Sequence, residues 1–180
     1  RTLTYTLVPG SAGQTTLDAT HGACWATVQD NTNQRPVVVV SMHLDDGGDN
    51  DGVRAQQAAQ VIKSINAGTT PVLLIGDMNG SRSRPTDKVR EFLKPRGFDD
   101  AYDIAGRYDT KTHYSSAHGW NPVADTATLW GAHIDRAFVS PGIHVSSWGQ
   151  VEPMNGNRYL QLLSDHDPLK VSLQIPRSPD

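Results

Sequence analysis

The sequence predicts an α/β sandwich, a layered fold in which strands outnumber helices. Short runs of β-branched and alternating residues recur along the 180-residue chain, and few segments have the character of a helix. The strands therefore do not alternate regularly with helices. Because a doubly wound sheet needs about one helix for each strand, the pattern favours sheets packed in layers.

The strands are predicted from alternation and from runs of β-branched residues. Val37 to Met42 is a continuous run of this kind, typical of a strand buried on both faces. The turn residues 30–33 separate it from the preceding strand, which predicts a hairpin. The predicted strands are residues 2–8, 23–29, 37–42, 71–75, 134–139, 143–147 and 169–175.

Two helices are predicted between these strands. The clearer one covers residues 53–67 and ends at Gly68. Its expected apolar face consists of Val53, Ala55, Ala58, Ala59, Ile62 and Ile65. A shorter helix covers residues 87–94 and stops before Pro95, and residues 99–131 are predicted to form a long irregular loop.

The composition indicates one globular domain without a disulfide framework. The net charge is only −3, so the chain lacks the strongly basic character of many nucleic-acid-binding domains. Cys24 has no second cysteine to pair with, and beside Trp25 we expect it to be a buried structural thiol. No stretch approaches the length of a membrane span. The low lysine content favours a secreted bacterial protein, with a cytoplasmic one as the alternative.

Four polar clusters lie at the ends of predicted strands. They are Ser41–Asp45, Gly76–Gly80, His133–Arg136 and Ser164–Leu169. Each has a structural explanation when taken alone; the second, for example, is also a typical turn sequence. Because strand ends that are distant in sequence can converge on one edge of a sheet, the four together predict a single polar site.

The side chains in these clusters suit phosphoester hydrolysis. A carboxylate can orient or deprotonate a water, and a hard divalent cation is bound by oxygen ligands. A histidine held by a carboxylate can stabilise a transition state or move a proton. Asp135 lies within an apolar strand, where an unpaired carboxylate is costly, and His166 is its expected partner.

In this order the clusters resemble the motifs of the endonuclease/exonuclease/phosphatase superfamily, which includes pancreatic deoxyribonuclease and bacterial neutral sphingomyelinases. Gly76-Asp77-Met78-Asn79 resembles its Gly-Asp-x-Asn motif, and Ser164-Asp165-His166-Asp167-Pro168 resembles its Ser-Asp-His-x-Pro motif. Ile134 to Ser140 resembles its Ile-Asp-x-x-x-Val-Ser strand, and His43 lies where members carry a histidine.

The resemblance implies a four-layer αββα sandwich of two mixed β-sheets flanked by helices. The family's motifs for its first strands have no counterpart in the sequence. Residues 1–176 are therefore expected to be the C-terminal portion of a single domain of this type, with the N-terminal part absent, and residues 177–180 to be a tail.

The resemblance also implies roles for five catalytic residues. Asp77 would orient or activate the attacking water, and Asn79 would hold the scissile phosphate. His166, polarised by Asp135, would stabilise the transition state or act as general base. His43 would contact a phosphate oxygen on the side of the leaving group.

The metal site implied by the resemblance is expected to be incomplete. Asp165 would bind or support Mg²⁺, with Mn²⁺ or Ca²⁺ as alternatives. Family members carry a metal-binding glutamate on their second strand, whereas the two glutamates of this chain, Glu91 and Glu152, fall in a helix and a late loop. We therefore expect an N-terminal fragment of the same domain, on a separate chain, to supply that glutamate.

The expected activity is that of a Mg²⁺-dependent phosphoesterase or nuclease-like hydrolase, acting by in-line attack of an activated water. The substrate is left open between nucleic acid, phospholipid and sugar phosphate. The alternative is a non-catalytic binding module that keeps the fold but lacks the metal-binding glutamate.

Overall fold

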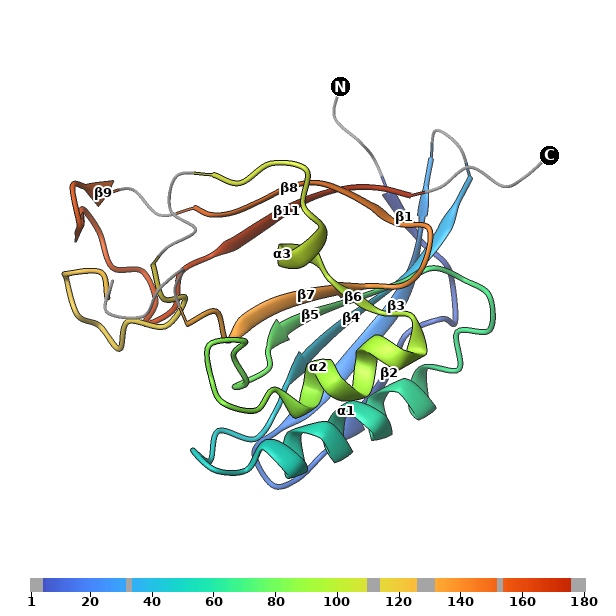
Figure 1. Ribbon diagram of the computed structural model, residues 1–180. Helices are drawn as coiled ribbons and strands as arrows, with labels where there is room; N and C mark the ends of the chain where they lie inside the picture. Colours follow the sequence, from blue (N-terminus) through green and yellow to red (C-terminus); the bar gives the residue numbers. More distant parts are fainter. Residues whose placement is uncertain (1–4, 32–33, 110–113, 126–131, 152–153, 176–180) are drawn as a thin grey trace.

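A mixed sheet of seven strands forms the centre of the protein (Figure 1). The computed structural model describes residues 5–31, 34–109, 114–125, 132–151 and 154–175. The strand order is β1-β3-β4-β5-β7-β6, and β2 pairs with β3. These strands are β1 (Tyr5–Leu7), β2 (Gly13–Thr16), β3 (Gly22–Asp30), β4 (Pro36–His43), β5 (Val72–Asp77), β6 (Asp99–Asp100) and β7 (Asp135–Val139).

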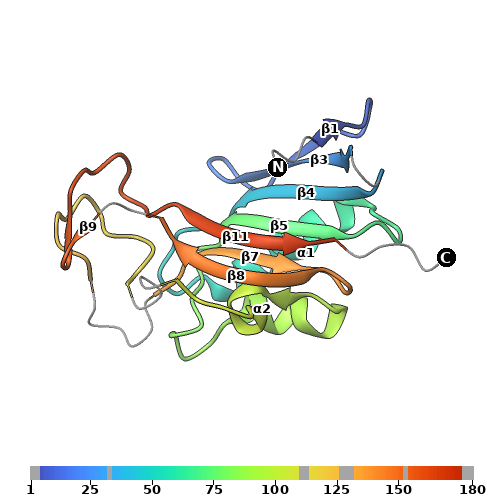
Figure 2. The ribbon, with the colours of Figure 1, turned by 90° about the horizontal axis from the view of Figure 1, so that it is seen from above.

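Helices cover one face of this sheet and a second sheet covers part of the other (Figures 1 and 2). The helical layer contains α1 (Asp51–Ile65) and α2 (Lys88–Leu93). The second sheet pairs β8 (His144–Gln150) with β11 (Leu169–Gln174). The remaining elements are the 3₁₀ turn η1 (Lys94–Arg96), α3 (Ala101–Ile104) and the hairpin of β9 (Met154–Asn155) and β10 (Arg158–Tyr159). This arrangement is the α/β sandwich that the sequence predicts.

The topology brings three of the polar clusters to one edge of the large sheet. Strands β4 and β5 are parallel, joined through α1, so His43 and Asp77 both lie at the ends of their strands on the same edge. Strand β7 is antiparallel to β5 and places Asp135 opposite Asp77. The carboxyl ends of two strands and the start of a third therefore meet.

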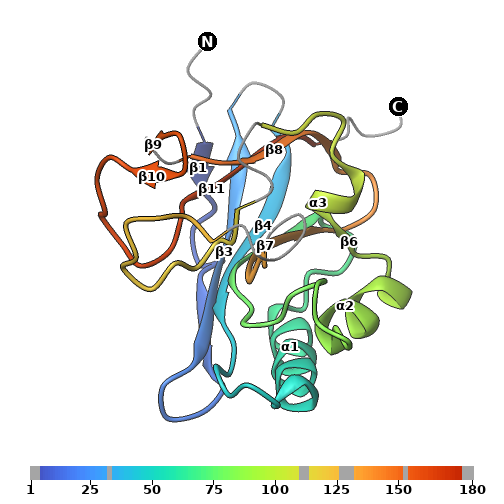
Figure 3. The ribbon, with the colours of Figure 1, turned by 60° about the vertical axis from the view of Figure 1, so that its left-hand side comes forward.

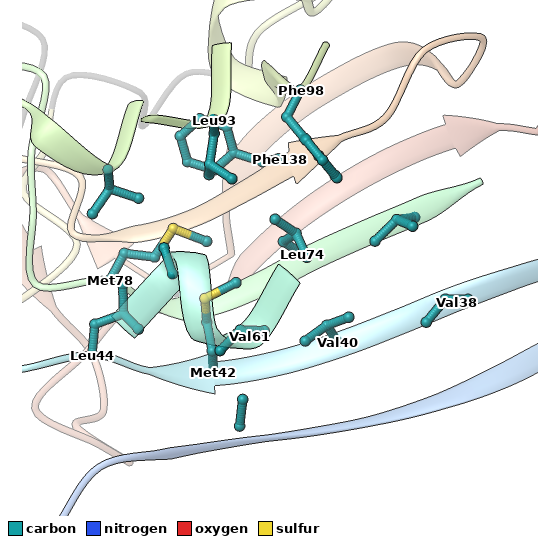
Figure 4. Close-up of a cluster of buried hydrophobic side chains, with 14 residues drawn as sticks. Val38, Val40, Met42, Leu44, Val61, Leu74, Met78, Leu93, Phe98 and Phe138 are labelled. Atoms are coloured by element: carbon teal, nitrogen blue, oxygen red, sulfur yellow. The ribbon is translucent and has the colours of Figure 1, made fainter. Parts of the chain in front are cut away.

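Strand β4 is buried on the face toward the helices, whereas Ser41 and His43 are exposed, so the predicted burial on both faces holds for only part of the strand. Val38, Val40 and Met42 pack toward the helices with Leu74 and Phe138, forming the larger core cluster (Figure 4). The alternate residues of β4 contribute to a second cluster between the two sheets, where the fully buried Trp148 lies. The period of two along the strand thus divides its side chains between two cores.

The buried face of α1 matches the predicted one at Ala58, Ile62 and Ile65 but differs elsewhere. Val53 is 41% exposed, whereas Arg54 and Gln57 are buried with Ala58 and Val61. The Arg54 guanidinium donates to the carbonyls of Asp45 and Gly47, at 3.1 and 2.7 Å. A pattern of apolar residues alone misses part of this face, because two polar side chains are buried through hydrogen bonds to a neighbouring loop.

Two further expectations were wrong. Cys24 is exposed rather than buried: it follows Ala23, which packs in the larger core cluster, so it lies on the opposite face of β3, where it pairs with the exposed Ser41. The stretch 99–131 is not wholly irregular, since β6 and α3 form within it. The predicted tail at 177–180 lies outside the described residues. Within the described ranges, no helix is long and apolar enough to cross a membrane.

Candidate active site

The His166 imidazole lies between two carboxylates. Its Nδ1 is 2.8 Å from Oδ2 of Asp135, and its Nε2 faces Oδ2 of Asp77 at 4.0 Å. From the other side, Nε2 of His43 lies 3.8 Å from the same Asp77 oxygen. The structure therefore brings together four of the predicted catalytic residues, with two imidazoles flanking one carboxylate.

The charges at the site favour a protonated His166. Burial lowers the pKa of this imidazole, but Asp135, Asp77 and Asp165 together outweigh burial and raise it above its ordinary value. The pKa of Asp77 is also raised, chiefly by burial and further by the charge of Asp135, while the Asn79 amide and the two histidines oppose the shift. Asp77 is consequently a stronger base than an exposed aspartate.

The Gly-Asp-x-Asn loop is held by its backbone. Gly76 has φ +131°, and a Cβ there would lie 2.0 Å from the carbonyl oxygen of Met42, so only glycine fits. Oδ1 of Asp77 accepts the Asn79 amide at 2.8 Å. The Asn79 side chain donates to the carbonyl of Leu44 at 2.8 Å, which orients it beside the site. The motif therefore forms a tight turn and also places polar side chains at the site.

Arg136 supports this loop from inside the protein, a role that its place in the motif did not reveal. Its guanidinium is 3% exposed and donates to Oδ2 of Asp100 at 2.6 and 3.1 Å. It also donates to Asp87 at 2.9 Å and to the carbonyl of Gly80 at 3.2 Å. Burial lowers the pKa of Arg136, yet the two carboxylates hold it above its usual range. One buried cation thus ties the end of the loop to α2 and β6.

A second histidine–carboxylate pair lies beside His43. His21 Nδ1 is 2.8 Å from Asp18, and its ring centroid is 4.7 Å from that of His43. Asp18, His21 and Asp45 have ligand atoms at spacings that would suit a metal. However, Asp18 already accepts hydrogen bonds from two backbone amides and from Gln57, so these groups have a structural explanation. Beyond the residue types, no pattern in the sequence predicts this pair.

The donor set nearest the predicted metal site is Asp77, Asp135 and His166, with ligand atoms that lie within 4.8 Å of one another. Asp165 is not part of this set. Its carbonyl accepts the amides of His118 and Gly119, and its carboxylate accepts the Ser164 hydroxyl at 3.4 Å. Mg²⁺ prefers six oxygen ligands, and this set offers two carboxylates and one imidazole. The described residues thus fit a divalent cation only together with oxygens from other sources.

The fold and the site together define a class of α/β sandwich proteins with a histidine–carboxylate centre at the strand ends of one sheet edge. The chain belongs to the endonuclease/exonuclease/phosphatase family, whose model matches residues 5–166. Members of this superfamily are phosphoesterase hydrolases and typically depend on a divalent metal. No curated protein matches the sequence significantly.

Solved structures show the same fold. A mannosyl-6-phosphatase from Bacteroides thetaiotaomicron has a TM-score of 0.73 and 20% identity, over 95% of this chain and 67% of the other. A family member from Bacteroides vulgatus has a TM-score of 0.73 and 21% identity, over 95% and 66%. D. rerio TDP2 complexed with a single-strand DNA product gives 0.66 and 16%, over 94% and 68%. The chain thus spans about two thirds of the length of these structures.

Proposed function

We propose that this protein hydrolyses a phosphoester bond by in-line attack of an activated water. The observation that carries the proposal is the convergence of His166 and His43 on Asp77, with ring nitrogens 4.0 and 3.8 Å from one carboxylate oxygen. Two groups that can donate hydrogen bonds to phosphoryl oxygens thus flank a carboxylate that can take a proton.

Asp77 is the proposed base that orients and deprotonates the water. Its raised pKa supports this role, because a more basic carboxylate accepts a proton more readily. His166 is the proposed donor to the phosphoryl oxygen on which charge develops. Asp135 holds its Nδ1 and favours the protonated ring, so Nε2 carries a hydrogen toward the site.

His43 and Asn79 are proposed to hold the ends of the phosphoester. The His43 side chain is 53% exposed, so it can reach a phosphate oxygen on the leaving side. The Asn79 amide uses one hydrogen on the Leu44 carbonyl and keeps the other for the phosphate. These two contacts would fix the phosphorus in line with the water on Asp77.

Asp165 and a glutamate of an N-terminal segment are proposed to hold the Mg²⁺ together. Mn²⁺ or Ca²⁺ could take the place of this ion. When bound, such an ion neutralises phosphate charge and assists departure of the leaving oxygen. Asp165 adjoins His166 in sequence, so its carboxylate would bring the ion next to the phosphoryl group.

An apolar groove marks where the segment carrying that glutamate would pack. The groove has a volume of about 540 Å³ and lies between the large sheet and β11, with Val39, Leu73 and Leu173 in its lining. Strand β11 pairs only with β8 among the described strands, and Figure 2 shows β3 and β4 uncovered beside it. We propose that strands of an N-terminal segment, on this polypeptide or on a separate one, pair with β11 and cover this face.

The distribution of charge favours a small phosphoester, such as a sugar phosphate, over a nucleic acid. Arg82 pairs with Asp103 at 2.6 Å, and Arg84 donates to the Gly48 carbonyl at 3.0 Å. These cations nearest the Gly-Asp-x-Asn loop are engaged within the protein, and the net charge is −3. A nucleic acid needs several cations that neutralise successive phosphates.

Hydrolysis of chromogenic substrates tests the proposed function. The protein, purified with any polypeptide that accompanies it, should release p-nitrophenol from p-nitrophenyl phosphate or bis(p-nitrophenyl) phosphate with Mg²⁺. EDTA should reduce the rate to background, and added Mg²⁺ should restore it, because the ion supplies charge neutralisation. The ratio of the two rates separates phosphomonoesterase from phosphodiesterase activity, and intact mass identifies an accompanying segment. No release with any divalent ion, while phosphate still binds, would instead identify a binding module.

A further inference from the structure

Ser116 contacts both segments of the Asp135–His166 pair: the start of β7, which carries Asp135 and is called the first half here, and the loop that carries His166, called the second half. The residue is 2% exposed and belongs to the segment 114–125, which runs beside the hairpin β9–β10 (Figure 3). Asp135 begins β7, whereas His166 lies in the loop before β11. Among the described strands no ladder connects these two segments, so contacts of other groups help to set their separation.

The Ser116 hydroxyl holds the first half. Its Oγ accepts the backbone N–H of Ile134 at 3.0 Å and that of Asp135 at 3.1 Å. A hydroxyl oxygen has two lone pairs, so both bonds can form together. The carbonyl of Ile134 in turn accepts the amide of Met78, so this contact also reaches the Gly-Asp-x-Asn loop.

The Ser116 backbone holds the second half. Its carbonyl accepts the N–H of Asp167 at 2.7 Å, and the next residue, Ala117, forms an antiparallel bridge with His166. The Asp167 side chain is buried and accepts the Tyr159 hydroxyl at 3.0 Å, which anchors the loop from behind. The loop that carries His166 and the start of the strand that carries Asp135 are therefore both hydrogen-bonded to Ser116.

We propose that Ser116 is a positioning residue, whose hydroxyl and carbonyl keep Asp135 and His166 in the register that pairs them. This inference rests on the proposed function for its kinetic consequence but not for its structural one. Alanine at this position would leave two amides without their acceptor and free the start of β7 to shift. A shift of about 1 Å in a catalytic group can cost roughly a hundredfold in rate.

Kinetics of three variants test the kinetic consequence. Ser116→Ala should lower kcat by roughly tenfold to a hundredfold with little change in KM, since the misplaced groups act in the transition state. Ser116→Thr, which keeps the hydroxyl, should recover most of the rate. Ser115→Ala is the matched control, because its hydroxyl is also buried but contacts Ala132 and Asp125 instead of the paired residues. Equal losses in the two alanine variants, or a wild-type kcat in Ser116→Ala, would overturn the proposal.

Amide hydrogen exchange measured by NMR tests the structural consequence without any substrate. Exchange at Ile134 and Asp135 should be faster in Ser116→Ala than in the wild type and in Ser115→Ala, while the amide of Leu74 in the sheet centre stays protected. Unchanged exchange at both sites would overturn the proposal even in an active enzyme. If the wild type hydrolyses nothing, the proposed function fails, and the exchange data still decide whether Ser116 holds this register.

Discussion

The variant His166→Ala is expected to lower phosphoester hydrolysis by roughly 10²- to 10⁴-fold, the usual range for removal of a positioned acid–base group. The variant loses the donor whose Nε2 faces Asp77 and leaves Asp135 without its imidazole partner. The measurement is the rate with Mg²⁺ and a chromogenic substrate. His144→Ala, which removes an exposed imidazole from β8, is the matched control and should retain the wild-type rate.

The rate is expected to depend on pH through the protonation of His166. If protonated His166 is the donor, activity falls as the pH rises through its pKa, which the neighbouring carboxylates hold above its ordinary value. Among these carboxylates, Asp135 raises the pKa of His166 most. Asp135→Asn removes its charge, so the loss of activity at alkaline pH should begin at a lower pH. A profile that is unchanged in Asp135→Asn would contradict the role assigned to the pair, as would a wild-type rate in His166→Ala.

The largest loss of stability is expected from Arg136→Ala. Removing one partner of a buried ion pair typically costs about 3–5 kcal/mol, because the remaining charges stay buried without compensation. Here Asp100, only 4% exposed, and Asp87 would both lose the guanidinium between them. Urea unfolding followed by circular dichroism measures the loss.

Two further variants test whether the loss of stability in Arg136→Ala comes from the buried ion pairs. Lys88→Ala breaks an exposed, solvent-screened pair with Glu91 and should leave the free energy of unfolding nearly unchanged. Adding Asp100→Asn to Arg136→Ala should recover part of the loss, because the uncompensated charge is then removed. A loss no larger than that of Lys88→Ala would show that the buried network contributes little.

The sequence predicts the strands of the site well because their signals are local. The β-branched run of β4 and the apolar run before Gly76 define where these strands end, and the topology then brings His43 and Asp77 to one edge. The pairing of Asp135 with His166 was also predictable, since a carboxylate within an apolar strand requires a partner. These inferences need only the period of a strand and the cost of burying a charge.

The supporting groups could not be predicted because their partners are distant and their residue types are common. Ser116 acts through backbone amides that any sequence provides, and Arg136 binds mainly the carboxylates of Asp87 and Asp100, which lie 49 and 36 residues away. The buried Arg54 and Gln57 broke the apolar pattern of α1 for the same reason. The exposure of Cys24 depends on which strands the second sheet covers, and no property of the residues around it reports this.

Binding of inorganic phosphate, followed at the histidine rings by NMR, tests most directly whether the strand ends form one phosphate site. The chain has seven histidines, which makes the readout specific. With Mg²⁺ present, the ring signals of His43 and His166 should shift together and saturate at one phosphate concentration, while that of His144 stays unchanged. Shifts of equal size at His144, or no shift at either His43 or His166, would contradict a shared phosphate centre.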